Sequence, residues 1–119
     1  MITLYGISNC DSVKKAKKWL GDHAIVYAFH DFRVDGLNEE QIEQWLQQVP
    51  SDKLLNKRST TWKQLPDTLK NDLAADNAAQ SLLIKTMEAH PTLIKRPILV
   101  VADDNIQVGF SATNYEQLI

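Results

Sequence analysis

The order of patterns in residues 2–32 limits the folds open to this chain more than any other feature of the sequence. Residues 2–7 are rich in β-forming side chains, residues 11–22 carry apolar side chains at helical spacing, and residues 24–32 are again β-rich. A helical crossover between two consecutive strands makes those strands parallel. The sequence therefore predicts a strand–helix–strand unit with a parallel pair of strands.

The rest of the chain predicts helices followed by an antiparallel hairpin. Asn38 begins a helix, with Gln41 placed to complete a capping box and Pro50 placed to end the helix. Residues 53–64 show no clean period, so we expect irregular structure there. The remaining predictions are helices over 66–75 and 78–89, strands over 98–102 and 106–110 with a turn at 103–105, and a short helix over 114–119.

This order of elements predicts an α/β fold with a mixed four-stranded sheet and an inserted helical subdomain, which is thioredoxin-like topology. A chain of 119 residues forms a single domain, since domains run to about 100 to 200 residues. We expect the thioredoxin-like core to include about residues 1–35 and 90–119. The helical insertion then covers about residues 36–89.

Charge and apolar patterning exclude several classes of function. The chain has 13 Lys and Arg against 15 Asp and Glu, a formal net charge of -2, so no global basic field attracts nucleic acid directly or an anionic membrane. Apolar runs such as residues 98–102 are far shorter than the ~20 residues that span a bilayer. Met1 leads into a strand-like segment rather than a signal peptide, so we expect a cytoplasmic protein.

Cys10 is the single cysteine, and it lies between the first predicted strand and the first predicted helix, directly after Asn9. At a helix N-terminus, unpaired backbone N–H groups and the helix dipole stabilise a thiolate, which is the nucleophilic form of cysteine. Lys14 lies one turn into the helix and can add positive charge near the sulfur. The alternative is that Cys10 is a small buried apolar residue. Its position between strand and helix favours an active-site nucleophile.

Metal chemistry finds little support in this sequence. One cysteine permits no internal disulfide and no cysteine-based metal cluster. The three histidines, His23, His30 and His90, lack the spacing of metal ligands. We expect no metal site and no resident cofactor.

Two basic segments are candidates for anion binding. Arg96 and Pro97 directly precede the predicted buried strand at 98–102, and the Arg96–Pro97 bond is a candidate for cis geometry. Arg58 lies in a basic, hydroxyl-rich stretch within the segment that shows no clean period, where functional residues are common. The alternatives are a solvated Lys–Arg pair with a strand-starting proline in the first segment, and a helix-capping surface turn in the second.

Three separated motifs together resemble the ArsC family of arsenate reductases and their relatives. The motifs are Cys10 with Lys14, residues 54–58 (Leu-Leu-Asn-Lys-Arg), and residues 90–100 (His-Pro-Thr-Leu-Ile-Lys-Arg-Pro-Ile-Leu-Val). Residues 9–16 and 59–66 are similar to the YffB branch of that family. The resemblance follows the chain in order over essentially its whole length.

The resemblance implies a thioredoxin fold with an inserted helical subdomain and a role for each matched residue. Cys10 would be the nucleophile, Arg58 and Arg96 would bind anions, Pro97 would be the cis-proline facing the cysteine, and Lys14 stands where relatives place a basic residue. The arsenate reductases of the family use glutathione or glutaredoxin as reductant, and a glutathione-dependent thiol reductase is the role proposed for the YffB branch. The expected activity is therefore that of a glutathione-dependent thiol reductase with glutathione as reductant or co-substrate, and with glutaredoxin as a further candidate partner.

Two other functions stay open. A reductase acting on arsenate itself is the first alternative. The arsenate reductases carry a third basic residue on the last strand, whereas residues 108–111 of this chain contain none. The related Spx-like proteins have similar motifs but bind RNA polymerase as transcriptional regulators, commonly with a Cys-x-x-Cys switch. Position 13 of this chain is Val13, so a mixed disulfide at Cys10 must be resolved by an outside thiol.

Overall fold

The computed structural model describes residues 2–75, 77–102 and 105–118, and these fall into two compact units, residues 1–36 with 96–119 and residues 37–95. Residues 90–95 belong to the second unit rather than to the expected thioredoxin-like core. Backbone hydrogen bonds explain this difference, because the Lys95 N–H donates to the Leu54 carbonyl (2.8 Å) and the Asn56 N–H donates to the Leu93 carbonyl (2.6 Å).

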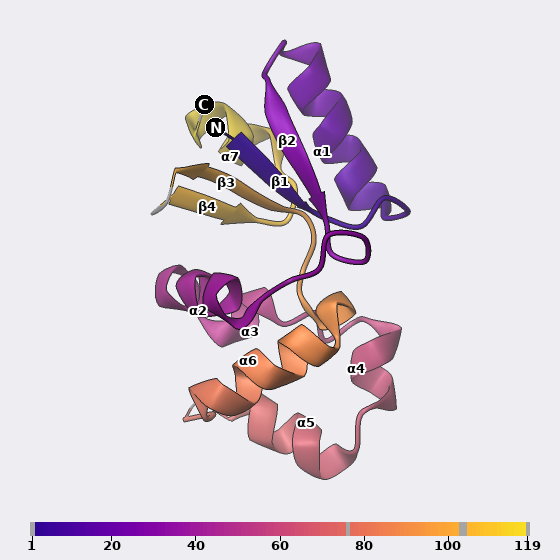
Figure 1. The fold of residues 1–119 in the computed structure, drawn as a ribbon, viewed down its shortest axis with the longest axis vertical. Helices are drawn as coiled ribbons and strands as arrows, with labels where there is room; N and C mark the ends of the chain where they lie inside the picture. The colour runs from indigo at the N-terminus through magenta and orange to yellow at the C-terminus, as the bar shows by residue number, and fades with distance from the viewer. Residues whose placement is uncertain (1, 76, 103–104, 119) are drawn as a thin grey trace. The chain divides into compact units, whose positions relative to one another are not determined.

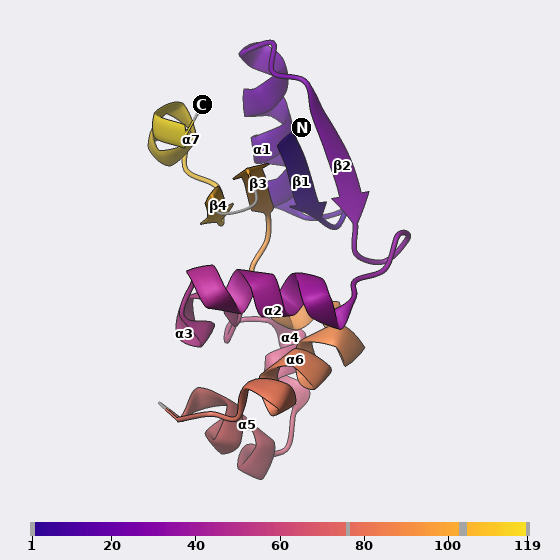
Figure 2. The same ribbon diagram turned by 60° about the vertical axis from the view of Figure 1, so that its left-hand side comes forward.

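The first unit is built on the predicted strand–helix–strand. It contains β1 (Ile2–Gly6), α1 (Asp11–Asp22) and β2 (Tyr27–Asp31), and β1 pairs with β2 in parallel, as predicted. In two views α1 lies alongside this strand pair (Figure 1, Figure 2). The strand predicted over 24–32 is shorter in the structure, because Ala24 adopts a positive φ of 55° and the Ile25 N–H donates to the Leu20 carbonyl (2.9 Å) to close the end of α1.

The predicted hairpin completes a four-stranded mixed sheet of order β2-β1-β3-β4. The strands β3 (Ile98–Ala102) and β4 (Asn105–Val108) pair antiparallel, and β3 also pairs antiparallel with β1. The partner strand was expected over 106–110 but ends at Val108, because Gly109 has a φ of 79° and its N–H donates to the Pro97 carbonyl (2.8 Å). Residues 103 and 104 of the predicted turn lie outside the described residues.

The last helix, α7 (Ala112–Leu118), begins earlier than the predicted 114–119. The Asn114 N–H donates to the Ser111 Oγ (3.3 Å) and the Tyr115 N–H donates to the Ser111 carbonyl (2.9 Å), so Ser111 starts the helix. The helix brings Tyr115 into the core of the unit, which also includes Leu4, Val13, Ala16, Leu20 and Leu99. Trp19 of α1 and Phe110 meet the Tyr115 ring edge to face, with centroids at 5.5 and 5.1 Å.

Gly6 permits a close approach between the end of β1 and the first turn of α1. A β-carbon at Gly6 would lie 2.6 Å from Cγ2 of Val13, which is fully buried and β-branched and so cannot turn aside without strain. The position of α1 on the sheet therefore depends on a glycine at residue 6.

The second unit is helical. Its elements are α2 (Glu39–Gln48), α3 (Ser51–Leu54), α4 (Thr60–Gln64), α5 (Asp67–Ala74), α6 (Gln80–Ala89) and a 3-10 turn (Pro91–Leu93). Asn38 and Gln41 form the predicted capping box of α2. The prediction of irregular structure over 53–64 was wrong, because this segment holds the end of α3 and all of α4, whose Trp62 N–H donates to the Ser59 Oγ (3.1 Å). Within the described residues, no helix is long and apolar enough to cross a membrane.

We predict that Gly6→Ala lowers the free energy of unfolding by about 1–3 kcal/mol, because the new methyl group overlaps Val13. Gly21→Ala is the matched control, since nothing lies within 4 Å of a β-carbon at this helical position. The control should be neutral or stabilising by up to about 1 kcal/mol. Urea unfolding measures both, and equal effects of the two substitutions would contradict the steric argument.

A second prediction concerns Tyr115, whose hydroxyl is buried without a hydrogen-bond partner among the described residues. Burial raises the pKa of this phenol above its ordinary value of about 10. The folded state thus favours the neutral phenol. The contribution of Tyr115 to the free energy of unfolding is therefore complete below about pH 10 and declines as the pH rises further. Tyr115→Phe should remove this alkaline loss, measured by urea unfolding at about pH 8 and about pH 10.5. An identical pH dependence in both proteins would show that Tyr115 does not titrate on unfolding.

Candidate active site

Cys10 ends the turn between β1 and α1 and is the N-cap residue of α1, with extended backbone angles (φ -104°, ψ 128°). Its side chain is partly buried, and its carbonyl accepts the Lys14 N–H at 3.0 Å, which is the first hydrogen bond of the helix. The sulfur therefore lies beside the N–H groups of the first turn, which have no partner within the helix. This is the placement that the sequence predicts.

The surroundings of Cys10 favour the thiolate. Burial raises the pKa of the thiol, but the backbone N–H of Val13, the Arg96 side chain and the backbone N–H of Ser12, all donors near the sulfur, act in the opposite direction. The Arg96 charge adds to this effect, and the balance holds the pKa of Cys10 below its ordinary value. Cys10 can thus act as a nucleophile at a lower pH than an ordinary thiol.

The sheet register explains how Arg96 reaches Cys10. β1 and β3 are antiparallel and pair Tyr5 with Ile98, so the start of β3 lies beside the end of β1. Arg96 directly precedes Pro97, which follows a cis peptide bond as the sequence suggested and is buried. Two residues that are distant in sequence, Cys10 and Arg96, are therefore brought together by strand pairing.

Asn9 has a partner that the sequence analysis missed. The Asn9 Oδ1 accepts a hydrogen bond from the Nη1 of Arg33 at 3.4 Å. Arg33 lies in the loop after β2, and parallel strands have their carboxyl ends at the same edge of a sheet, so this loop lies beside the loop after β1. The predicted parallel pair was a sufficient signal to place Arg33 near Cys10.

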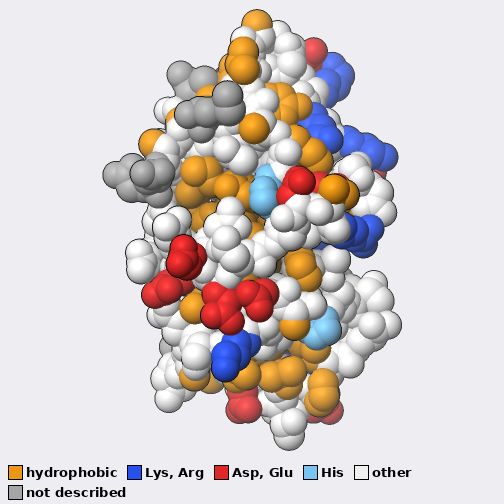
Figure 3. Space-filling model, in the orientation of Figure 1, with side chains coloured by type: hydrophobic (Ala, Val, Ile, Leu, Met, Phe, Trp, Pro, Cys, Tyr) orange, Lys and Arg blue, Asp and Glu red, His pale blue; other side chains and the backbone are white. Residues whose placement is uncertain are grey.

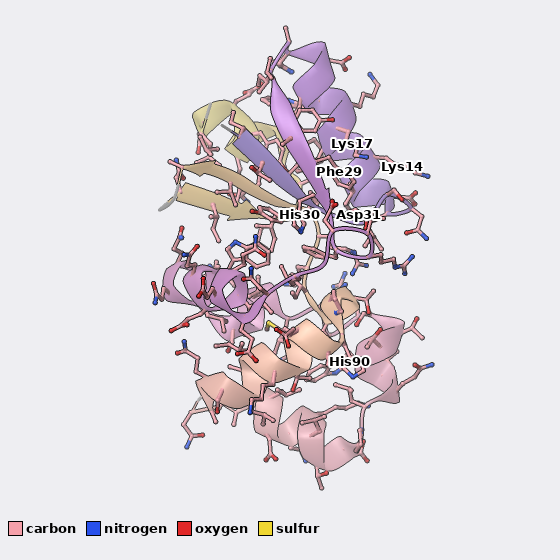
Figure 4. The ribbon with its side chains drawn as sticks, viewed as in Figure 1. Lys14, Lys17, Phe29, His30, Asp31 and His90 are labelled. Carbon is pink, nitrogen blue, oxygen red and sulfur yellow. The ribbon has the colours of Figure 1, made fainter. Side chains whose placement is uncertain are left out.

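Lys14 occupies an exposed position in the first turn of α1 (Figure 4). It belongs to a basic surface along this helix, and Figure 3 shows Lys and Arg side chains gathered there. Among the described residues, Lys14 is not one of the groups that lower the pKa of Cys10, and Arg96 supplies the positive charge. A direct role for Lys14 in substrate binding stays a prediction.

Arg58 belongs to the helical unit, which is described by itself. Its N–H donates to the Asn56 Oδ1 at 3.2 Å, and the Ser59 Oγ donates to the Asn56 carbonyl at 2.8 Å, so the loop between α3 and α4 is held by its own side chains. A cavity of about 380 Å³ is lined by Asp52, Leu55, Asn56, Lys57, Arg58 and Lys95. Three cations and one carboxylate give this cavity a basic lining suited to an anion. That Arg58 joins Cys10 in one site stays a prediction.

The histidines and tryptophans take structural positions. The His23 ring stacks on Trp19 with centroids 3.9 Å apart, and the His30 Nε2 lies 2.6 Å from the Gly36 carbonyl oxygen. Trp45 and Trp62 are buried. Within residues 2–75, 77–102 and 105–118, no group of three or more His, Cys, Asp or Glu side chains is arranged to hold a metal ion.

A thioredoxin-like sheet, a helical insertion and one cysteine at the N-terminus of the first helix define the class of protein. The ArsC family matches residues 5–118, and this chain belongs to that family. Among relatives, an uncharacterized protein of Haemophilus influenzae is 47% identical over 116 residues, covering 98% of this chain and 96% of that protein. The global transcriptional regulator Spx of Listeria innocua is 27% identical over 113 residues, covering 93% of this chain and 81% of that protein.

Solved structures give the same assignment. A YffB protein has a TM-score of 0.89 at 32% identity, covering 99% of this chain and 98% of that one. An arsenate reductase (ArsC) related protein from Brucella melitensis has a TM-score of 0.74 at 40% identity, covering 98% of this chain and 92% of that one. The chain is thus similar both to the YffB branch and to arsenate reductase-related proteins.

We predict that the rate of iodoacetamide alkylation of the folded protein, followed by mass, titrates with a midpoint below the ordinary thiol value of about 8.5. Arg96→Met should raise the midpoint, because it removes a hydrogen-bond donor and a positive charge from the thiolate. Lys14→Met is the matched control and should leave the midpoint unchanged. A midpoint at the ordinary value in the unmodified protein would contradict the stabilised thiolate.

Proposed function

We propose that this protein is a glutathione-dependent thiol reductase that uses Cys10 as its single catalytic thiol. The observation that carries the proposal is the position of Cys10 at the N-terminus of α1, where the first helical turn and Arg96 lower the pKa of the thiol. Membership of the ArsC family supports a thiol reductase, and the similarity to a YffB protein at 32% identity supports the same branch. Activity of this kind needs an accessible thiolate, and Cys10 is only partly buried.

The reaction proceeds in two exchanges at one sulfur. The Cys10 thiolate attacks the glutathione sulfur of a mixed disulfide, a Cys10–glutathione disulfide forms, and the substrate leaves as a thiolate that takes a proton from solvent. A second glutathione thiolate then attacks the glutathione sulfur bound to Cys10, releasing oxidised glutathione and the Cys10 thiolate. Each mixed disulfide thus consumes one free glutathione, and the two glutathionyl groups leave together as oxidised glutathione while the substrate is released as a thiol; glutaredoxin is a candidate partner for the second step.

Each site residue has a role in this scheme. Arg96 stabilises the Cys10 thiolate both before attack and as the leaving group of the second exchange. Arg58 and Lys14 offer positive charge to the two carboxylates of glutathione. Pro97 and Asn9 hold the backbone and the side chains around the sulfur.

The residue at position 13 explains why an outside thiol is required. Val13 occupies the place of the second cysteine of a Cys-x-x-Cys pair, and it is fully buried against Gly6. Val13 is thus part of the core of the first unit. Because the chain has no second cysteine, an outside thiol must resolve a disulfide at Cys10.

Reduction of arsenate itself is a second candidate function. The similarity at 40% identity to an arsenate reductase-related protein favours it, whereas the lack of a basic residue at positions 108–111 argues against tight binding of a free oxyanion. An assay with arsenate, glutathione and glutaredoxin separates this activity from thiol exchange.

A regulatory function is the third candidate, supported by the 27% identity to the transcriptional regulator Spx. Such a role needs a protein partner rather than turnover, and RNA polymerase is the partner to test. Recovery of polymerase subunits with the tagged protein from a lysate, together with no turnover of any disulfide, would favour regulation over catalysis.

We predict that Cys10→Ser reduces turnover of a glutathione mixed disulfide to the uncatalysed rate, because a hydroxyl is not ionised near neutral pH. The assay couples release of oxidised glutathione to NADPH oxidation by glutathione reductase. Cys10→Ala is the matched control for a residual effect of the hydroxyl. Full turnover by either variant would exclude Cys10 as the catalytic thiol.

A further inference from the structure

The loop that follows β2 is held in one conformation by its own hydrogen bonds. Asp31 is buried (8% exposed), and its Oδ1 accepts the Arg33 N–H at 2.8 Å. The Asp31 carbonyl accepts the N–H groups of Val34 (3.2 Å) and Asp35 (2.8 Å), and the Asp35 carboxylate accepts the Asp31 N–H at 3.0 Å. Figure 4 shows Asp31 where β2 passes into this loop. The backbone of Arg33 is therefore placed with little freedom.

The same loop is attached to the turn that carries Cys10. Gly6 pairs with Asp31 in the parallel register, and the Phe32 N–H donates to the Gly6 carbonyl at 2.8 Å. The Phe32 side chain is buried (2% exposed), which limits the freedom of the loop. Arg33, the next residue, is exposed, and its Nη1 donates to the Asn9 Oδ1 at 3.4 Å, one residue from Cys10.

The Arg33 guanidinium retains capacity to bind an anion. A guanidinium has five N–H donors, and the contact with Asn9 is long and involves a neutral acceptor. Among the residues that the structure describes, no carboxylate forms an ion pair with Arg33. The nearby Asp31 and Asp35 carboxylates accept backbone N–H groups of the loop. The positively charged Arg33 guanidinium is thus exposed to solvent beside the turn that carries Cys10.

We propose that Arg33 binds a carboxylate of the disulfide or thiol whose sulfur reacts with Cys10, and so selects anionic substrates such as glutathionyl disulfides. This inference rests on the proposed function and assigns a substrate-binding residue to it. Arg96 and Arg33 have different electrostatic roles in the site, and Arg33 adds to the proposed substrate-binding charge of Arg58 and Lys14. Arg96 is partly buried and acts on the thiolate, whereas Arg33 is exposed and meets the charge on the substrate. A planar guanidinium suits a carboxylate, because two parallel N–H···O contacts can form.

The test measures the first exchange alone, without turnover. The protein thiolate reacts with oxidised glutathione, which is anionic, or with bis(2-hydroxyethyl) disulfide, which is neutral, and mass spectrometry follows the Cys10 adduct. Each reaction joins the Cys10 sulfur to half of the disulfide and releases the other half as a thiolate. In Arg33→Met the ratio of the two rate constants, anionic over neutral, should fall about tenfold. Arg33→Lys should recover part of the ratio, since it restores charge without the planar guanidinium.

Two controls separate substrate binding from other effects. Lys18→Met removes one positive charge from an exposed position paired with Asp22 on α1, and it should leave the ratio unchanged. The alkylation midpoint of Cys10 should be the same in Arg33→Met as in the unmodified protein, because Arg33 is not among the groups that set the thiol pKa.

An unchanged ratio in Arg33→Met, or an equal fall in Lys18→Met, would overturn the role of Arg33 while the unmodified protein still forms the adduct. If the unmodified protein forms no adduct with either disulfide, the proposed thiol exchange itself fails. The two failures are therefore distinguishable in one experiment.

Discussion

The contact between Val13 and Gly6 determines where the reactive sulfur lies. α1 can approach the end of β1 closely only where the strand carries no β-carbon, and this approach sets the position of the first helical turn. Cys10 immediately precedes that turn, so the position of its sulfur relative to the sheet follows from a packing contact in the core, and its extended backbone angles place it beside the unpaired N–H groups. A core residue thus affects the position of the proposed nucleophile.

Strand pairing around β1 supplies the charged residues. β2 is parallel to β1 and contributes a loop at the shared carboxyl end, whereas β3 is antiparallel and contributes its first residues at the same place. Arg33 and Arg96 therefore arrive from opposite neighbours of one strand. The overall charge of -2 is compatible with this local basic site, because the register of a few residues, rather than the composition, concentrates the positive charge.

The sequence was sufficient for the elements that have a strong local signal. The apolar period over 11–22 gives α1, and the capping box at Asn38 gives the start of α2. The helices α3 and α4 were missed because segments of four and five residues are too short to display a helical period. The early end of β4 depends on the Gly109 N–H bond to Pro97, a tertiary contact that no local pattern encodes.

The residues of the candidate site also divide into those with a local sequence signal and those placed by tertiary structure. Cys10 is identified by its place between a strand and a helix, and Arg96 by its place before a buried strand. Arg33 has no local sequence motif, since an isolated arginine in a loop resembles any other surface residue. Its place beside Asn9 follows only from the parallel pairing of β1 and β2, which brings the two loops together. Arg58 lies in the helical unit, and its relation to the sulfur depends on long-range geometry that neither spacing nor periodicity encodes.

The burial of a valine at position 13 has a kinetic consequence. A chain with two neighbouring thiols can release a bound partner by a first-order reaction, because the second sulfur is present at a high effective concentration. This chain has one thiol, so every disulfide it forms includes another molecule, and release is a bimolecular reaction that is first order in the external thiol. The lifetime of the adduct therefore shortens as the thiol concentration of the surroundings rises, and the occupied fraction of Cys10 depends on the ratio of external disulfide to external thiol.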